Sequence, residues 1–119
     1  MKIVIEFIPQ DQQRYGTLGD WIWKDDETLH IYSSSDNGED EAFLVALHEL
    51  AEVWLCRKKG ITQEEVDAFD LAFEPPTDDP DAEPGDHPDA PYRYQHRQAM
   101  MIEHLMALFM GIPSYGTVR

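Results

Sequence analysis

The sequence predicts an α+β fold, in which a small N-terminal antiparallel sheet packs on two central apolar helices. Apolar and polar residues alternate with a period of two before Ser33, which is typical of strands, and follow helical spacing after Gly38. Two later segments, 42–56 and 100–110, are almost wholly apolar, as expected of helices that lie in a core. A peripheral helix and a long acidic loop complete the predicted fold. The 119 residues fit one domain, 1–119.

Residues 1–34 are expected to form the sheet. Segment 2–8 is rich in β-branched residues and ends at Pro9, which cannot donate a hydrogen bond to a neighbouring strand. Segments 20–24 and 28–33 alternate apolar and polar side chains on either side of three acidic residues. We therefore expect these two segments to form an antiparallel hairpin.

Residues 39–60 are predicted to form the core helix. Three basic residues and then Gly60 end this segment, and both cations and a left-handed glycine are typical of helix C-termini. Thr62 and Glu65 have the spacing of a capping box, in which each side chain binds the backbone of the other. The sequence therefore predicts a second helix over residues 62–74, which two prolines end.

An acidic, proline-rich loop over residues 75–91 is expected to lead into a third helix over residues 92–111. Between Gly60 and Pro91 there are eleven acidic residues and no Lys or Arg, so this segment carries most of the net charge of −15. Such a segment is a solvated loop, a site for divalent cations or a mimic of a nucleic-acid backbone. We expect residues 77–90 to be the most mobile internal segment, because no large apolar residue there offsets the entropy lost on ordering.

Charge and composition exclude several classes of protein. A net charge of −15 disfavours direct binding to nucleic acid or to an anionic membrane surface, since both would repel the chain. No segment approaches the run of about 18 apolar residues that spans a bilayer, and we recognise no signal peptide. The single cysteine, Cys56, cannot form an intrachain disulfide, which favours a reducing compartment. We therefore expect a soluble, cytoplasmic protein.

Polar side chains interrupt both apolar helices, and burial would be costly without a partner or a metal ion. His48 and Glu52 are four residues apart, so they project from the same face of the core helix and can hold one ion. His96 and Glu103 are seven apart on the third helix and also share a face. If the two helices pack antiparallel, all four side chains point into one gap. We expect them to be the ligands of a divalent cation.

The segment from His48 to Glu52, HELAE, resembles the metal-binding helix of the zincin metallopeptidases, whose motif is H-E-x-x-H. The likeness includes the apolar residues around the motif and the preceding hairpin, over residues 21–54. It implies that His48 and Glu52 bind Zn²⁺, that Glu49 is the catalytic base and that the protein is a hydrolase of proteins or peptides. Glu52 stands where the family has a second histidine. A carboxylate there lowers the Lewis acidity of the ion and also admits Mn²⁺ or Mg²⁺.

Three other interpretations stay open. The same polar residues can form a metal-free buried network, in which Glu103 satisfies a core histidine. Glu49 and Glu52, followed by Glu64 and Asp67, also resemble the paired acidic motifs with which all-α nucleoside-triphosphate pyrophosphatases hold Mg²⁺. An acidic interaction module that imitates nucleic acid needs no catalysis. The small acidic format resembles bacterial and phage accessory proteins of unassigned role.

Overall fold

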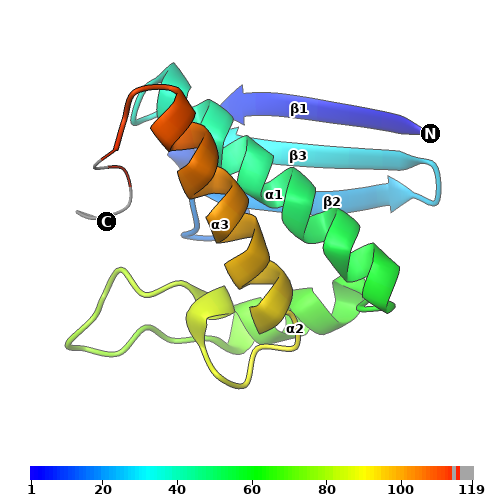
Figure 1. Ribbon diagram of the computed structural model, residues 1–119. Coiled ribbons are helices and arrows are strands. Elements are labelled where there is room, and N and C mark those ends of the chain that lie inside the picture. The colour runs from blue at the N-terminus through cyan, green and yellow to red at the C-terminus, as the bar shows by residue number, and fades with distance from the viewer. Residues whose placement is uncertain (114, 116–119) are drawn as a thin grey trace.

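The computed structural model describes residues 1–113 and 115, and in this part the chain forms a three-stranded sheet and three α-helices (Figure 1). The strands are β1 (Lys2–Ile8), β2 (Gly19–Asp25) and β3 (Thr28–Ser34). The helices are α1 (Glu39–Lys59), α2 (Gln63–Ala72) and α3 (Arg93–Phe109), with 3-10 turns η1 (Gln10–Gln12) and η2 (Pro84–Asp86). The predicted α+β fold is confirmed. Residues 114 and 116–119 of the predicted domain lie outside the described part.

The sheet is mixed, which corrects the expectation of a wholly antiparallel one. Its order is β1-β3-β2, with β2 and β3 forming the predicted antiparallel hairpin and β1 running parallel to β3. The physical reason is the connection of residues 9–18, which is long enough to carry the chain to the far edge of the sheet. The tight hairpin then places β3 in the middle, where Leu29 and Ile31 are fully buried.

Helix α1 covers one face of the sheet, and α3 packs on α1. Helix α1 lies across the strands, α3 packs beside it in the opposite direction, and α2 lies at the periphery as predicted (Figure 1). Gly60 ends α1 in the left-handed conformation with φ of 72°, which glycine adopts without the strain that a side chain would cause. The predicted capping box is present at the start of α2. The side chain of Thr62 accepts from the backbone N–H of Glu65, and the side chain of Glu65 accepts from the backbone N–H of Thr62.

The apolar pattern predicts that both apolar helices are buried on all sides. The structure corrects this expectation, because each of them has an exposed side. Met101, Leu105 and Phe109 on the outer side of α3 are 72%, 51% and 73% exposed, and Phe43 and Trp54 of α1 are also exposed. The reason is that the described part of the chain has only two layers, so nothing covers the outer sides of these helices. None of the helices in the described residues is long and apolar enough to cross a membrane.

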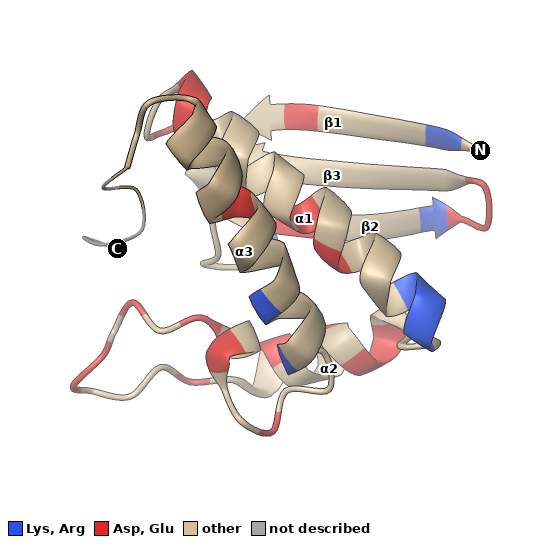
Figure 2. Cartoon of the chain, in the orientation of Figure 1, with Lys and Arg blue, Asp and Glu red and all other residues tan. Residues whose placement is uncertain are grey.

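The acidic loop leaves α2 and returns to the start of α3 (Figure 2). Its first part, residues 74–81, is exposed, as expected of a solvated acidic segment. Its second part differs, because Pro84 and Gly85 in η2 are buried against the helices. The return of this turn to the core brings further acidic groups to the polar residues of α1 and α3.

Candidate metal centre

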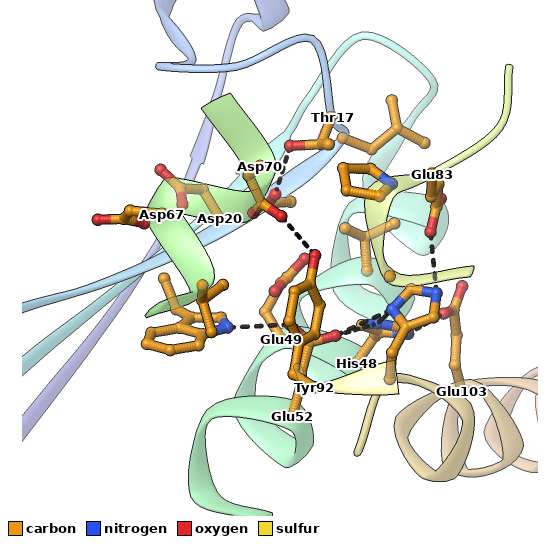
Figure 3. A pocket seen from close by; sticks show the side chains of 18 residues that line it. Thr17, Asp20, His48, Glu49, Glu52, Asp67, Asp70, Glu83, Tyr92 and Glu103 are labelled. Atoms are coloured by element: carbon orange, nitrogen blue, oxygen red, sulfur yellow. Dashed lines mark hydrogen bonds and ion pairs between the residues drawn. The ribbon is translucent and has the colours of Figure 1, made fainter. Parts of the chain in front are cut away.

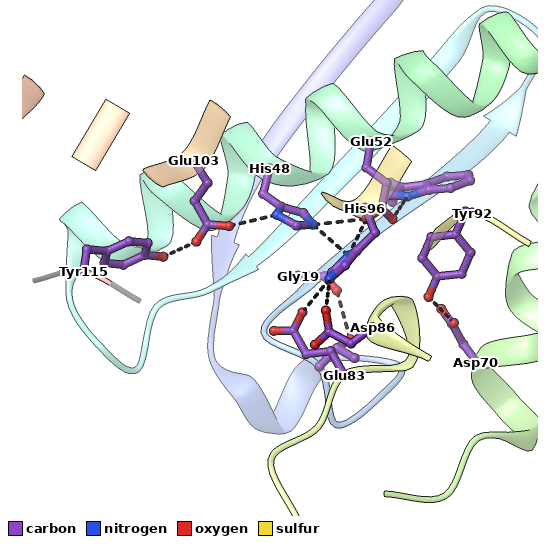
Figure 4. A network of polar contacts seen from close by, with 12 residues as sticks. Gly19, His48, Glu52, Asp70, Glu83, Asp86, Tyr92, His96, Glu103 and Tyr115 are labelled. Atoms are coloured by element: carbon purple, nitrogen blue, oxygen red, sulfur yellow. Dashed lines mark hydrogen bonds and ion pairs between the residues drawn. The ribbon is translucent and has the colours of Figure 1, made fainter. Parts of the chain in front are cut away.

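Helices α1 and α3 bring the predicted site residues together. His48 and Glu52 lie one turn apart on α1 and point toward α3, whose antiparallel packing places His96 opposite them (Figure 4). These three residues are between 4% and 5% exposed. Polar groups buried to this extent need hydrogen-bond partners or a bound ion.

Three ligand atoms form a small triangle at this position. Glu52 Oε2 lies 3.1 Å from His48 Nε2 and 3.0 Å from His96 Nδ1, and the two nitrogens are 3.2 Å apart. Ligand atoms about 2.0 to 2.1 Å from a tetrahedral Zn²⁺ are about 3.3 Å from one another, so the triangle has nearly the size that zinc requires. His48, Glu52 and His96 can therefore hold a divalent cation.

Each histidine has a carboxylate on its other nitrogen. His48 Nδ1 lies 2.8 Å from Glu103 Oε1, and Tyr115 donates its hydroxyl to the other oxygen of Glu103. His96 Nε2 lies 3.1 Å from Asp86 Oδ1 and 3.3 Å from Glu83 Oε2. Because an ionised carboxylate only accepts, both rings donate their outer N–H and direct the inner nitrogen toward Glu52.

A hydrogen bond from a neighbouring side chain also orients Glu52. The indole Nε1 of Trp21, on β2, donates to Glu52 Oε1 over 3.1 Å, which leaves Oε2 to face both histidines. Gly85 fixes the ring of His96, since a Cβ at Gly85 would lie only 2.5 Å from Cγ and Nδ1 of that ring. All three ligand atoms are thus held in place by the surrounding protein.

The centre favours positive charge. Burial alone would lower the pKa of His48, but hydrogen bonds to Glu103 and Glu52 outweigh burial and raise the pKa to about 10. The pKa of His96 rises to about 12, because bonds to Asp86, Glu52 and Glu83 outweigh burial in the same way. For Glu52, burial is opposed by bonds from both histidines, and its pKa falls to about 2. In the absence of metal, protons take the place of a cation.

Glu49 lines a cavity of about 50 Å³ beside this triangle (Figure 3). That volume is enough for at least one water molecule, since about 10–15 Å³ on this measure is sufficient. Glu49 reaches this place because Gly19 has no side chain, and a Cβ there would lie 2.4 Å from Glu49 Oε1. Burial, reinforced by the charge of Glu52, holds the pKa of Glu49 well above its ordinary value.

Asp70 and Tyr92 form another wall of the cavity. The Tyr92 hydroxyl donates to Asp70 Oδ1 over 2.6 Å. Burial raises the pKa of Asp70 to about 7, although the bond from Tyr92 acts in the opposite direction. A wider groove of about 600 Å³ opens next to the cavity and shares part of its wall. The residues common to both are Thr17, Leu18, Asp70, Glu83 and Pro84.

The structure brings all five predicted site residues to the triangle or to the cavity beside it. Glu103 contacts His48 on the side away from His96, which is the position of a hydrogen-bond partner to a ligand. The acids of the pyrophosphatase interpretation are divided. Asp67 lines the cavity and binds Arg14, whereas Glu64 is exposed and lines a separate depression.

Sequence reasoning missed the groups that hold the ligands from outside. They are Trp21, Glu83, Gly85 and Asp86. Two signals were present: a buried indole needs an acceptor, and the Pro84-Gly85 pair marks a tight turn within the acidic loop. No family model, curated protein or solved structure matches this chain.

Proposed function

We propose that this protein binds one divalent cation, best Zn²⁺, through His48, Glu52 and His96, and that it is a metal-dependent hydrolase of proteins or peptides. The triangle of ligand atoms supports the proposal most. Neutral imidazoles that donate their outer N–H have lone pairs on the inner nitrogens, and two lone pairs 3.2 Å apart repel each other. A cation between them removes this repulsion, and two histidines with one carboxylate are a typical ligand set for zinc.

Hydrolysis is supported by the place of Glu49. A divalent ion in this centre would supply Lewis acidity toward a carbonyl group or water. Glu49 lines the adjoining cavity, and within the described residues its carboxylate makes no hydrogen bond or ion pair. It is therefore free to accept a proton from a water molecule held there. A nearby cation also favours the ionised form of Glu49, which a base requires.

The groove beside the cavity supports a peptide as the substrate. It is lined by apolar side chains together with Glu41, Asp70, Asp81 and Glu83, and it has no Lys or Arg. A nucleoside triphosphate would be repelled by this wall, whereas a neutral or basic peptide would be attracted. The same observation disfavours the pyrophosphatase interpretation. We also propose a cytoplasmic location, because the single thiol, Cys56, is buried in α1 and has no second cysteine to pair with.

Metal binding is tested by elemental analysis of protein purified without chelator. We expect about one zinc ion per chain, and a lower melting temperature after chelation, because a ligand that binds only the folded state stabilises it. His96→Ala should lose the metal and the chelator effect together. His30→Ala, a histidine of the sheet outside the centre, is the matched control and should keep both. Unchanged metal content in His96→Ala would refute the proposed ligands.

Catalysis is tested separately with Glu49→Gln. This variant should retain the metal and lose hydrolysis of an unfolded protein substrate, since a proton acceptor need not be a ligand. Glu64→Gln changes an exposed acid of α2 and should leave hydrolysis intact. If Glu49→Gln hydrolyses the substrate as fast as the wild type, the proposed role of Glu49 as the base is wrong. The proposed metal binding is not affected by that result.

A further inference from the structure

Strand β1 is an edge of the sheet, and no strand of the described residues pairs with its outer side. The backbone N–H of Lys2 donates to the carbonyl oxygen of Glu27, in the turn between β2 and β3. The carbonyl oxygen of Ile8 accepts from the backbone N–H of Ser35, which follows β3. Backbone groups alternate in direction along a strand, so the even-numbered residues of β1 face β3. Ile3 and Ile5 therefore present unpaired N–H and C=O groups at the open edge.

The side chains of the same residues form an uncovered apolar strip. Ile3 and Ile5 are paired in register with Leu29 and Ile31, which are fully buried beneath the helices. Yet Ile3, Ile5 and Phe7 are 43%, 45% and 45% exposed, because β1 lies at the edge of the sheet, where α1 contacts it less than it contacts β2 and β3. A long, apolar and unpaired edge strand is one that proteins usually cover.

The sequence of β1 is self-complementary about Val4. In an antiparallel pair of two copies with the two-fold axis at Val4, Ile3 lies opposite Ile5 of the second copy. Lys2 then lies opposite Glu6 of the second copy, and the same pair occurs again on the other side of the axis. Figure 2 shows these opposite charges toward the two ends of the strand. A symmetric interface requires this kind of self-complementarity.

The backbone directions agree with this register. Ile3 and Ile5, which face the open edge, become the hydrogen-bonded pair. Lys2 and Glu6 become a non-hydrogen-bonded pair, in which side chains approach most closely. A shift by one residue would bring outward-facing residues opposite inward-facing ones. A shift by two residues would place Lys2 or Glu6 opposite Val4, so opposite charges select the register centred on Val4.

We propose that β1 pairs antiparallel with β1 of a second copy of this chain, joining two sheets into one six-stranded sheet. Two chains that each carry a charge of −15 repel each other over most of their surfaces. Strand β1 has one Lys and one Glu, so its net charge is zero. The edge thus offers both the unpaired backbone and the balanced charge that a second copy needs.

Sedimentation equilibrium of the full chain tests this dimer, and the wild type should reach twice the chain mass of 13.8 kDa. Lys2→Glu places two acids opposite each other at both symmetric pairs, and Glu6→Lys does the same with two bases. Each reversal should raise the dimer dissociation constant about tenfold or more. The double variant Lys2→Glu/Glu6→Lys restores opposite charges and should return within about threefold of the wild type.

Two controls separate this edge from other surfaces. Lys58→Glu changes an exposed charge at the end of α1, and Met101→Glu changes the exposed apolar side of α3. Neither should weaken the dimer. All the substituted side chains are exposed, so the variants should fold, which circular dichroism checks. A monomeric wild type, a dimer that Met101→Glu weakens and the β1 reversals do not, or a double variant that fails to recover would each overturn the proposal.

Discussion

His48 Nε2 and His96 Nδ1 face each other across 3.2 Å, although each ring already directs its other nitrogen at a carboxylate. Glu52 Oε2 is close to both nitrogens, so three electron-rich atoms meet in a buried place. Such an arrangement is stable only with positive charge between the atoms, whether protons or a metal ion supply it.

Gly85→Ala should weaken metal binding without removing any ligand. The new methyl group would lie 2.5 Å from Cγ and Nδ1 of His96, so the ring must move away from Glu52. We expect zinc affinity to fall by about 10- to 100-fold, as it does when outer groups that orient a ligand are lost. Competition with a chromogenic chelator measures this change. Gly16→Ala is the control, because a Cβ there meets nothing within 4 Å, and equal affinities of the two variants would contradict the role of Gly85.

Asp86→Ala should lower zinc affinity about tenfold or more, because His96 loses a carboxylate that orients its ring. Glu83 still contacts His96 Nε2 in this variant, so removing Glu83 as well should lower the affinity further. Isothermal titration calorimetry measures both steps. Asp81→Ala removes an exposed acid of the same loop and serves as the control for loss of general negative charge. If Asp81→Ala weakens binding as much as Asp86→Ala does, the effect is one of overall charge.

Trp21→Phe should destabilise the metal-free protein by about 1–3 kcal/mol, because Glu52 Oε1 remains buried without its donor. The phenylalanine ring keeps most of the packing in the core, so the lost hydrogen bond dominates the change. Urea unfolding in the presence of a chelator gives the free energy of unfolding. Trp54→Phe, at a site that is 40% exposed, should change this free energy little. Equal losses in the two variants would mean that the indole hydrogen bond contributes nothing.

The metal-free protein should lose stability as pH rises above about 6.5. The folded-state pKa values of His48 and His96 are raised, so their contribution is complete below 6.5 and falls as pH approaches about 10. The pKa of Glu52 is lowered to about 2, so its contribution is present above about 4.5 and is lost as pH falls toward 2. Thermal unfolding in chelator from pH 3 to 10 should therefore show greatest stability between about 4.5 and 6.5.

Zinc binding near neutral pH should release about two protons, one from each of His48 and His96, since a ligand nitrogen must be deprotonated. Calorimetry in buffers with different ionisation enthalpies counts these protons. The affinity should also rise with pH. Release of no protons, with affinity independent of pH, would show that the ion binds away from the two histidines.

Much of the site could be predicted because its core lies on helices, whose period fixes which side chains share a face. The spacing of His48 and Glu52 places them on one face of α1, and the spacing of His96 and Glu103 places those two on one face of the opposing helix. The outer partners could not be predicted in this way. Glu83 and Asp86 belong to a loop with many acids, and only the tertiary fold shows which of them return to the core.

The sheet was predicted in part for a similar reason. The alternation of apolar and polar residues predicted the hairpin of β2 and β3, since its two strands are neighbours in sequence. The direction of β1 depends on the path of residues 9–18, which carry no periodic pattern. The almost wholly apolar segment 100–110 suggested that this part of α3 is buried all round. Its exposed side follows from the number of layers in the fold, which residue patterns do not report.

The most direct test of the metal centre is anomalous X-ray diffraction from crystals of the zinc-loaded protein, measured at the zinc absorption edge. We predict one strong peak per chain, about 2.0–2.2 Å from His48 Nε2, His96 Nδ1 and Glu52 Oε2. Glu103 should contact His48 and not the ion. No peak at this position, or a peak held only by the acids of residues 74–89, would contradict the proposed centre.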